Sequence, residues 1–86
     1  MTNVYVVRVD KRVSRELRRL PLIEAERLIA AIKRLAADPR PPGVSKLVDR
    51  PGWRIRVGVY RVLYKIDDVA REVYVLKAGH RRFVYN

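Results

Sequence analysis

The chain has 86 residues and a mass of 10.1 kDa, so we expect a single domain over residues 1–86. It contains no cysteine, which excludes disulfides and zinc–thiolate sites. Its longest apolar run, residues 28–32, is far shorter than the roughly 20 residues that span a bilayer. The N-terminus also lacks the basic-then-apolar order of a signal peptide. These properties predict a small cytoplasmic protein that does not associate with membranes.

Charge is the most informative property of the composition. Twenty Lys and Arg stand against nine Asp and Glu, giving a formal net charge of +11. Fifteen of the basic residues are arginines, whose planar guanidinium suits phosphate oxygens and stacks on bases. Ten basic residues precede Val44 and ten follow it, so the charge belongs to the folded domain and not to a tail. Solubility or an acidic protein partner would also account for the charge, but the arginine bias favours a polyanion.

The first half of the chain predicts one strand followed by two helices. Val4–Val9 is rich in β-branched residues, as strands are. Asp10 is a candidate N-cap for a helix over residues 11–20, which carries one apolar stripe. Pro21 suits the first turn of a second helix, which Asp38–Pro39 would end. Two short helices joined this tightly should form a helical hairpin.

The second half predicts three strands joined by short turns. The alternating segments are residues 53–57, 60–66 and 71–78, and Gly79 is expected to break the last of them before a short basic C-terminal segment. Short turns favour an antiparallel meander. We therefore expect an α+β fold with an N-terminal strand, a helical hairpin and then a three-strand meander. The helices should pack on one face of a single sheet.

The strand pattern predicts a basic open face on that sheet. Alternation places Arg54 and Arg56 opposite the apolar residues of their strand, and it places Arg61 and Lys65 opposite those of the next. Cations gathered on one small face repel each other unless an anion lies there. A solvated face with incidental arginines is the alternative interpretation.

Familiar catalytic devices are missing from the sequence. There is no Cys nucleophile, glycine-rich phosphate loop or metal-ligand spacing, and Asp67–Asp68 suits a turn, so we expect neither a metal nor a cofactor. Metal-free RNA cleavage by the ribose 2′-OH remains open, whereas DNA lacks that group. It needs cations at the phosphate and groups that transfer protons. Candidates for proton transfer are His80, Tyr85 and neighbouring lysines, although His80 also fits an exposed histidine and Tyr85 an anchor for the C-terminus.

Two segments resemble a known family. The runs 53–64 and 75–85 contain a glycine followed by Tyr60-Arg61 and Tyr64, then Gly79-His80-Arg81-Arg82 and a terminal Tyr85. Together with Asp38–Pro39 and Lys46–Leu47, they strongly resemble the RelE toxins of the RelE/ParE superfamily over nearly the whole chain.

The resemblance implies a type II toxin that is partnered by an antitoxin, enters the ribosomal A site and cleaves mRNA there. Such toxins use no metal and leave a 2′,3′-cyclic phosphate and a 5′-hydroxyl. By position, Arg61 would hold the scissile phosphate, Arg81 would stabilise the transition state, and Tyr85 would act as a base or stack on one. Contacts to RNA and the ribosome are expected from Arg54, Arg56, Lys46, Lys65 and Arg82.

One departure from the family bears on the acid–base chemistry. Arg54 and Arg56 stand where the best-studied member has lysines, and arginine is a poor proton donor or acceptor. If a lysine serves that chemistry elsewhere in the family, this chain must use His80 or Tyr85 instead.

Three other functions are compatible with the sequence. The first is a ParE-like protein that inhibits DNA gyrase by binding, because the fold alone does not decide between the two activities. The others are a basic RNA-binding module and an inactive toxin. In the toxin interpretations we expect an acidic antitoxin, lying over the helical hairpin or beside the arginine-rich face.

Overall fold

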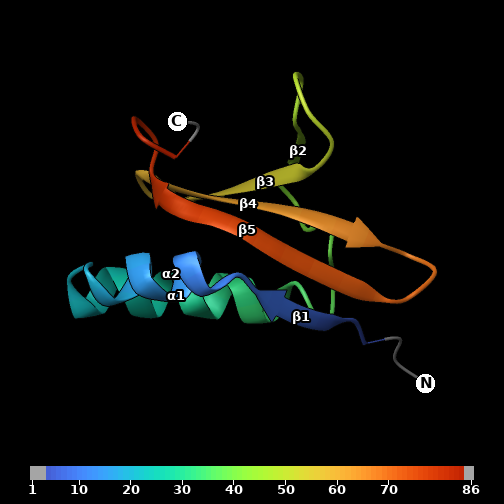
Figure 1. The fold of residues 1–86 in the computed structure, drawn as a ribbon, viewed down its shortest axis with the longest axis horizontal. Helices are drawn as coiled ribbons and strands as arrows, with labels where there is room; N and C mark the ends of the chain where they lie inside the picture. Colours follow the sequence, from blue (N-terminus) through green and yellow to red (C-terminus); the bar gives the residue numbers. More distant parts are fainter. Residues whose placement is uncertain (1–3, 85–86) are drawn as a thin grey trace.

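In the computed structural model, which describes residues 4–84, two helices pack against a five-stranded sheet (Figure 1). The elements are β1 (Val6–Val9), α1 (Lys11–Arg18), α2 (Leu22–Arg34), β2 (Ser45–Lys46), β3 (Trp53–Val57), β4 (Tyr60–Asp67) and β5 (Glu72–His80). The strand order is β1-β5-β4-β3-β2, with β1 parallel to β5 and the other neighbours antiparallel. The predicted α+β class and meander are confirmed. The short edge strand β2 was not predicted, because two residues carry no readable alternation.

Local signals set the boundaries of the helical hairpin. The Asp10 side chain accepts a hydrogen bond from the backbone N–H of Arg12 at 2.8 Å and so caps α1, as its position predicts. Pro21 is the N-cap of α2, so the helix begins at Leu22, one position after the predicted start at Pro21. Each helix ends earlier than its apolar stripe suggests, at Arg18 and at Arg34, because the last residues of each stripe form turns.

The core lies between the hairpin and one face of the sheet. Its largest fully buried side chains come from both layers and are Tyr64, Leu28, Leu35, Val13, Val62, Val73 and Val75. In Figure 1 the helices run along one side of the sheet, while the C-terminal turn and the β2–β3 connection project away from them. The helices therefore leave the other face of β3, β4 and β5 uncovered.

A β-bulge in β5 changes which sheet face each of the last residues of that strand occupies. Leu63 pairs with Lys77 but Tyr64 pairs with Val75, so Leu76 is an extra residue on β5. Beyond it, Lys77 and Gly79 face away from the helices, whereas Ala78 and His80 face toward them. The expectation that Gly79 breaks the strand was wrong. Gly79 pairs with Arg61 inside β5, and its backbone lacks the positive φ of the turn glycines.

Within residues 4–84 no helix combines the length and the apolar character needed to cross a membrane.

Candidate anion-binding site on the open face

Three arginines of β3 and β4 lie on the sheet face opposite the helices. Arg56 pairs directly with Arg61, and Arg54 pairs with Leu63. Directly paired residues share a face and successive residues alternate, so these arginines lie opposite the buried Ile55 and Val62. The predicted assignment of the two faces is confirmed.

The C-terminal turn adds a fourth arginine to this face. The backbone N–H of Arg81 donates to the carbonyl of Val59 at 2.9 Å, which continues the β4–β5 ladder by one residue. Alternation therefore places Arg81 on the same face as Gly79 and Arg61. We call Arg54, Arg56, Arg61 and Arg81 the arginine face. Arg82 is exposed in the following turn. Tyr85, the last predicted site residue, lies outside the described residues.

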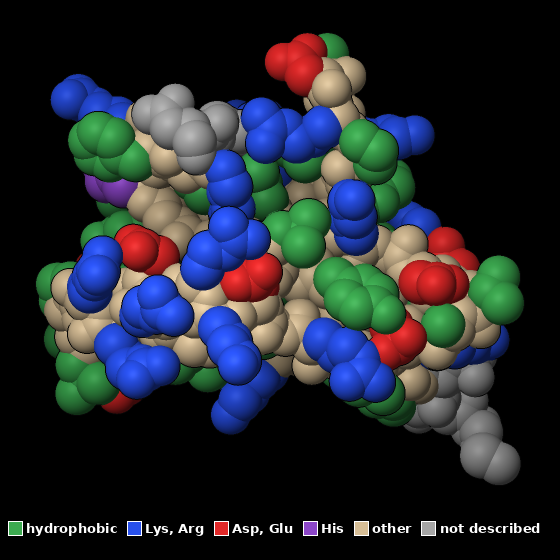
Figure 2. Space-filling view, in the orientation of Figure 1, with side chains coloured by type: hydrophobic (Ala, Val, Ile, Leu, Met, Phe, Trp, Pro, Cys, Tyr) green, Lys and Arg blue, Asp and Glu red, His purple; other side chains and the backbone are tan. Residues whose placement is uncertain are grey.

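The surroundings of the arginine face carry little negative charge along the chain. Neither residues 53–66 nor residues 73–84 contain an Asp or a Glu. Arg56 and Arg81 are exposed, and Arg54 and Arg61 are half-buried. Figure 2 shows Lys and Arg side chains spread over both layers of the molecule, as expected for charge that belongs to the domain. Cations held this close on a rigid sheet favour the binding of an anion.

The structure does not bring His80 together with the arginine face. His80 pairs with Tyr60 on the helix side of the sheet, and its ring centroid lies 6.0 Å from that of Tyr60 and 5.9 Å from that of Phe83. Its Nδ1 accepts a hydrogen bond from the backbone N–H of Arg82 at 3.1 Å. His80 also lines a cavity of about 520 Å³, with Glu16 among the other lining residues. This arrangement is typical of a side chain that fixes the C-terminal turn.

The lysines divide between the two faces. Lys65 is exposed and faces away from the helices, as predicted. Lys46 pairs with Trp53, and its Nζ lies 5.9 Å from the centroid of that ring, so it lies at the β2 edge and apart from the arginine face. Lys77, absent from the predicted set, is half-buried on the open face opposite Leu63. Strict alternation from Val73 and Val75 would place Lys77 on the helix side, because the bulge at Leu76 is not visible in the sequence.

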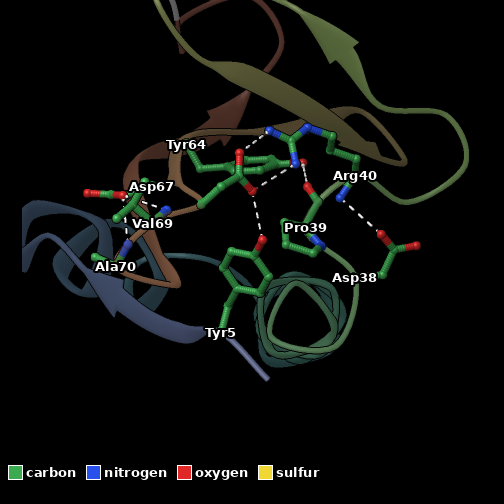
Figure 3. Close-up of polar contacts among 9 residues, drawn as sticks. Tyr5, Asp38, Pro39, Arg40, Tyr64, Asp67, Val69 and Ala70 are labelled. Carbon is green, nitrogen blue, oxygen red and sulfur yellow. Dashed lines mark hydrogen bonds and ion pairs between the residues drawn. The ribbon is translucent and has the colours of Figure 1, made fainter. Parts of the chain in front are cut away.

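A second arginine-containing cluster lies at the β4–β5 turn (Figure 3). Arg40 donates to both carboxylate oxygens of Asp68, at 3.2 and 2.9 Å, and the Tyr5 hydroxyl donates to the same carboxylate at 2.7 Å. The Arg40 guanidinium also lies 5.0 Å from the centroid of the Trp53 ring. We call Tyr5, Arg40 and Asp68 the Asp68 cluster. It joins the residue before β1, the loop after α2 and the β4–β5 turn.

Hydrogen bonds account for the titration of the Asp68 cluster. Donation by Arg40, and then by Tyr5, lowers the pKa of Asp68 to about 2. Nearby, the buried Tyr64 hydroxyl donates to the carbonyl of Pro39 at 2.7 Å, and burial raises the pKa of Tyr64 to about 12. Asp67 accepts from the backbone N–H groups of Val69 and Ala70, at 3.1 and 2.9 Å, and so serves the turn as predicted. Among residues 4–84, no three His, Cys, Asp or Glu side chains gather as a metal site would require.

An apolar groove lies on the far side of the molecule from the arginine face. It has a volume of about 780 Å³ and lies between β1 and the two helices. Leu22 on its wall is 73% exposed, and the rim carries Arg18 and Lys33. The remaining lining residues are Val7, Val9, Ser14, Leu17, Leu20, Ala25, Ile29 and Ile32. An apolar groove with a basic rim is typical of a surface that binds another protein.

Comparisons with known proteins agree with this fold. Residues 7–85 match the family model described as the ParE toxin of the type II toxin–antitoxin system parDE. The Mycobacterium tuberculosis toxin RelG is 33% identical over 87 residues, which cover 94% of this chain and 95% of that protein.

Solved structures of RelE toxins superpose well on the chain. RelE of the archaeal RelE–RelB complex from Pyrococcus horikoshii is 29% identical with a TM-score of 0.81, covering 98% of this chain and 100% of that one. A mutant of Escherichia coli toxin RelE in the free state is 26% identical with a TM-score of 0.73, covering 90% of this chain and 83% of that one. The chain therefore belongs to the RelE/ParE superfamily of type II toxin–antitoxin toxins.

Proposed function

We propose that this toxin is a ribosome-dependent endoribonuclease that cleaves mRNA in the ribosomal A site without a metal. The observation that carries the proposal is the arginine face, where Arg56 pairs with Arg61 and the ladder continues to Arg81. Four guanidinium groups on one side of a rigid sheet suit the sugar–phosphate backbone of RNA. The RelE structures among the relatives support the same activity.

The reaction is an attack of the ribose 2′-oxygen on the adjacent phosphorus. The bond to the 5′-oxygen breaks, which leaves a 2′,3′-cyclic phosphate and a 5′-hydroxyl. We assign to Arg61 and Arg81 the stabilisation of the charge that develops on the phosphate oxygens. One group must take the 2′-hydroxyl proton and another must give a proton to the leaving oxygen.

We assign the proton transfers to Tyr85 or to a lysine of the open face. Guanidinium groups keep their protons, so the arginine face supplies charge and not acid–base chemistry. His80 is a poor candidate because its ring lies on the helix side and its Nδ1 already accepts a backbone hydrogen bond. Lys65 and Lys77 carry the amines on the open face.

We propose that the antitoxin occupies the groove between β1 and the helices. Two of the solved relatives are RelE–RelB and RelBE2 complexes, so proteins of this fold assemble with antitoxins. The exposed Leu22 and the basic rim at Arg18 and Lys33 suit an amphipathic, acidic helix of the partner. The sequence left two positions open for the antitoxin, over the helical hairpin or beside the arginine face. We propose the first of these.

Inhibition of DNA gyrase by binding is the second candidate function. The matching family model is that of ParE toxins, and RelE and ParE toxins share one superfamily fold. An inhibitor that acts only by binding has no need for four arginines gathered on one face of the sheet. The arginine face therefore favours the ribonuclease.

The deciding experiment measures mRNA cleavage on programmed ribosomes with the purified chain and a metal chelator. Primer extension locates the cut ends. We expect cuts in the A-site codon and a rate that falls about 10²-fold or more in Arg61→Ala, as expected for loss of transition-state stabilisation. Intact message with the wild-type chain would overturn the proposal, and inhibition of gyrase supercoiling would then support the second candidate.

A further inference from the structure

We propose that Gly79 keeps a space open in the arginine face for the sugar–phosphate backbone of RNA. The inference rests on the proposed ribonuclease function and assigns a role within the same site. Gly79 lies in the interior of β5, directly paired with Arg61. The role is one of clearance, because a residue without a side chain contributes room and no chemical group.

The fold itself does not require glycine at this position. Gly58 has a φ of 61° in the β3–β4 turn, and Gly52 has a φ of 128° with Tyr64 O only 2.9 Å from an added Cβ, so both are structural. Gly79 has no positive φ, and among residues 4–84 a Cβ built on it meets no atom within 4 Å outside its two chain neighbours. Glycine weakens the interior of a strand. A residue that is unfavourable locally and unnecessary for packing is best explained by the ligand.

The position of the gap points to its occupant. Antiparallel geometry places the backbone of Arg61 about 5 Å from Gly79, and Arg81 follows two residues along the chain, about 7 Å away. Arg56 continues the row across β3. A side chain at position 79 would project from the same face as Arg61, directly across the ladder, and as Arg81, two residues along the chain. The missing side chain thus leaves free the volume in which both can reach one phosphate.

The row of cations favours an extended polyanion over a single small anion. Arg56, Arg61 and Gly79 lie side by side on three neighbouring strands, so the gap is the end of a cationic track across the sheet. Phosphate contacts position a nucleic acid without reading its bases. We therefore assign the gap to the RNA backbone at the cleaved link and not to a base.

The test replaces Gly79 by alanine and by valine in the full chain. Thermal unfolding of both variants should be unchanged or shifted upward, because alanine and valine suit a strand better than glycine does. Cleavage on programmed ribosomes should fall with side-chain size, by about 10²-fold for valine, as expected for a small displacement of the reacting groups. Tyr74→Trp adds bulk to the same face of the same strand, far from Arg61, and should cleave at the wild-type rate.

The outcomes separate this inference from the function on which it rests. Wild-type chain that leaves message intact overturns the proposed function before any variant is compared. Wild-type cleavage together with an equally active Gly79→Val overturns the role of Gly79 alone. A loss of rate that follows a loss of thermal stability in both variants also overturns it, because the glycine would then serve the fold. Loss of rate in Gly79→Ala at full stability supports it.

Discussion

The two ends of strand β4 use arginine in different ways. At the β4–β5 turn, Arg40 is bonded to both oxygens of Asp68 and lies over the Trp53 ring. At the β3–β4 end, Arg56 pairs with Arg61 and Arg81 lies beside Val59, in segments without an acidic residue. The first arginine neutralises a carboxylate and ties three segments together. The second group accumulates charge on one face.

This difference shows that a net charge of +11 does not by itself locate a binding site. Composition counts Arg40 and Arg81 alike, but only the arrangement of their neighbours separates an arginine that joins segments of the fold from one that belongs to a cationic cluster. An arginine chelated by a carboxylate has its field largely cancelled, whereas clustered arginines reinforce each other. Removing one arginine from each end is therefore the most direct way to test the comparison.

The largest effect is expected from Arg81→Ala, with Arg40→Ala as its matched control. Arg81→Ala should lower mRNA cleavage on programmed ribosomes by about 10²-fold at unchanged thermal stability, because an exposed guanidinium that stabilises the transition state is lost. Arg40→Ala should cleave at the wild-type rate and unfold at a lower temperature, because it breaks the Asp68 cluster. Equal rate losses in the two variants would contradict the division between the two ends.

The salt dependence of ribosome binding should also distinguish the arginine face from Arg40. If four arginines contact phosphates of single-stranded RNA, the logarithm of the ribosome-binding constant should fall with the logarithm of salt concentration with a slope of about −3. Arg56→Ala should make that slope shallower by about 0.7, and Arg40→Ala should leave it unchanged. Binding isotherms at several potassium chloride concentrations measure it. A slope near zero would mean that the arginine face takes no part in the encounter.

Sequence reasoning located the arginine face but not all of its neighbours, and the bulge explains why. β3 and the paired part of β4 alternate without interruption, so the faces of Arg54, Arg56 and Arg61 follow from the pattern. In β5 the extra residue Leu76 is apolar like Val75 before it, so nothing in the sequence marks where the alternation shifts.

Other features depend on contacts between distant segments. The shift at Leu76 moves Lys77 onto the open face and His80 onto the helix side. The parallel pairing of β1 with β5 and the short strand β2 arise from tertiary packing, which local pattern does not encode. Arg81 was predicted as a site residue only from the family resemblance. Its position beside β4 follows from the hydrogen bond between its backbone N–H and the carbonyl of Val59.

At the structural end of β4, Tyr64→Phe tests the buried hydrogen bond to Pro39. Removing the hydroxyl leaves a buried carbonyl without its donor, so unfolding free energy should fall by about 1–2 kcal/mol at neutral pH. Tyr74→Phe is the control, because its hydroxyl donates to Glu72 at an exposed position and should matter less. Urea unfolding measures both, and cleavage should be unaffected. A loss of cleavage at full stability would extend the functional region to this end.

The raised pKa of Tyr64 also predicts a difference between the wild type and Tyr64→Phe in how their stability depends on alkaline pH. The folded state holds this phenol neutral up to a pKa of about 12, whereas an unfolded tyrosine ionises near 10.0. Stability from Tyr64 is therefore present below pH 10 and lost as pH rises toward 12. Tyr64→Phe should lose less stability than the wild type over that range. Parallel alkaline curves for the two proteins would show that Tyr64 is not held neutral by burial.

The smallest effect concerns Asp68 and acid. Its folded pKa of about 2 lies below the usual 3.8, so its stabilising contribution is present above about pH 4 and lost as pH falls toward 2. Asp68→Asn removes that contribution at every pH, so the two proteins should differ slightly at pH 7 and converge near pH 2. Because the side chain is 54% exposed, salt should weaken the difference. Urea unfolding between pH 2 and pH 7 measures this convergence. A difference in unfolding free energy that persisted at pH 2 would mean that Asp68 stabilises the fold through packing and not through its charge. The contrast between Arg40, which neutralises a carboxylate, and the clustered arginines at the other end of β4 would then fail.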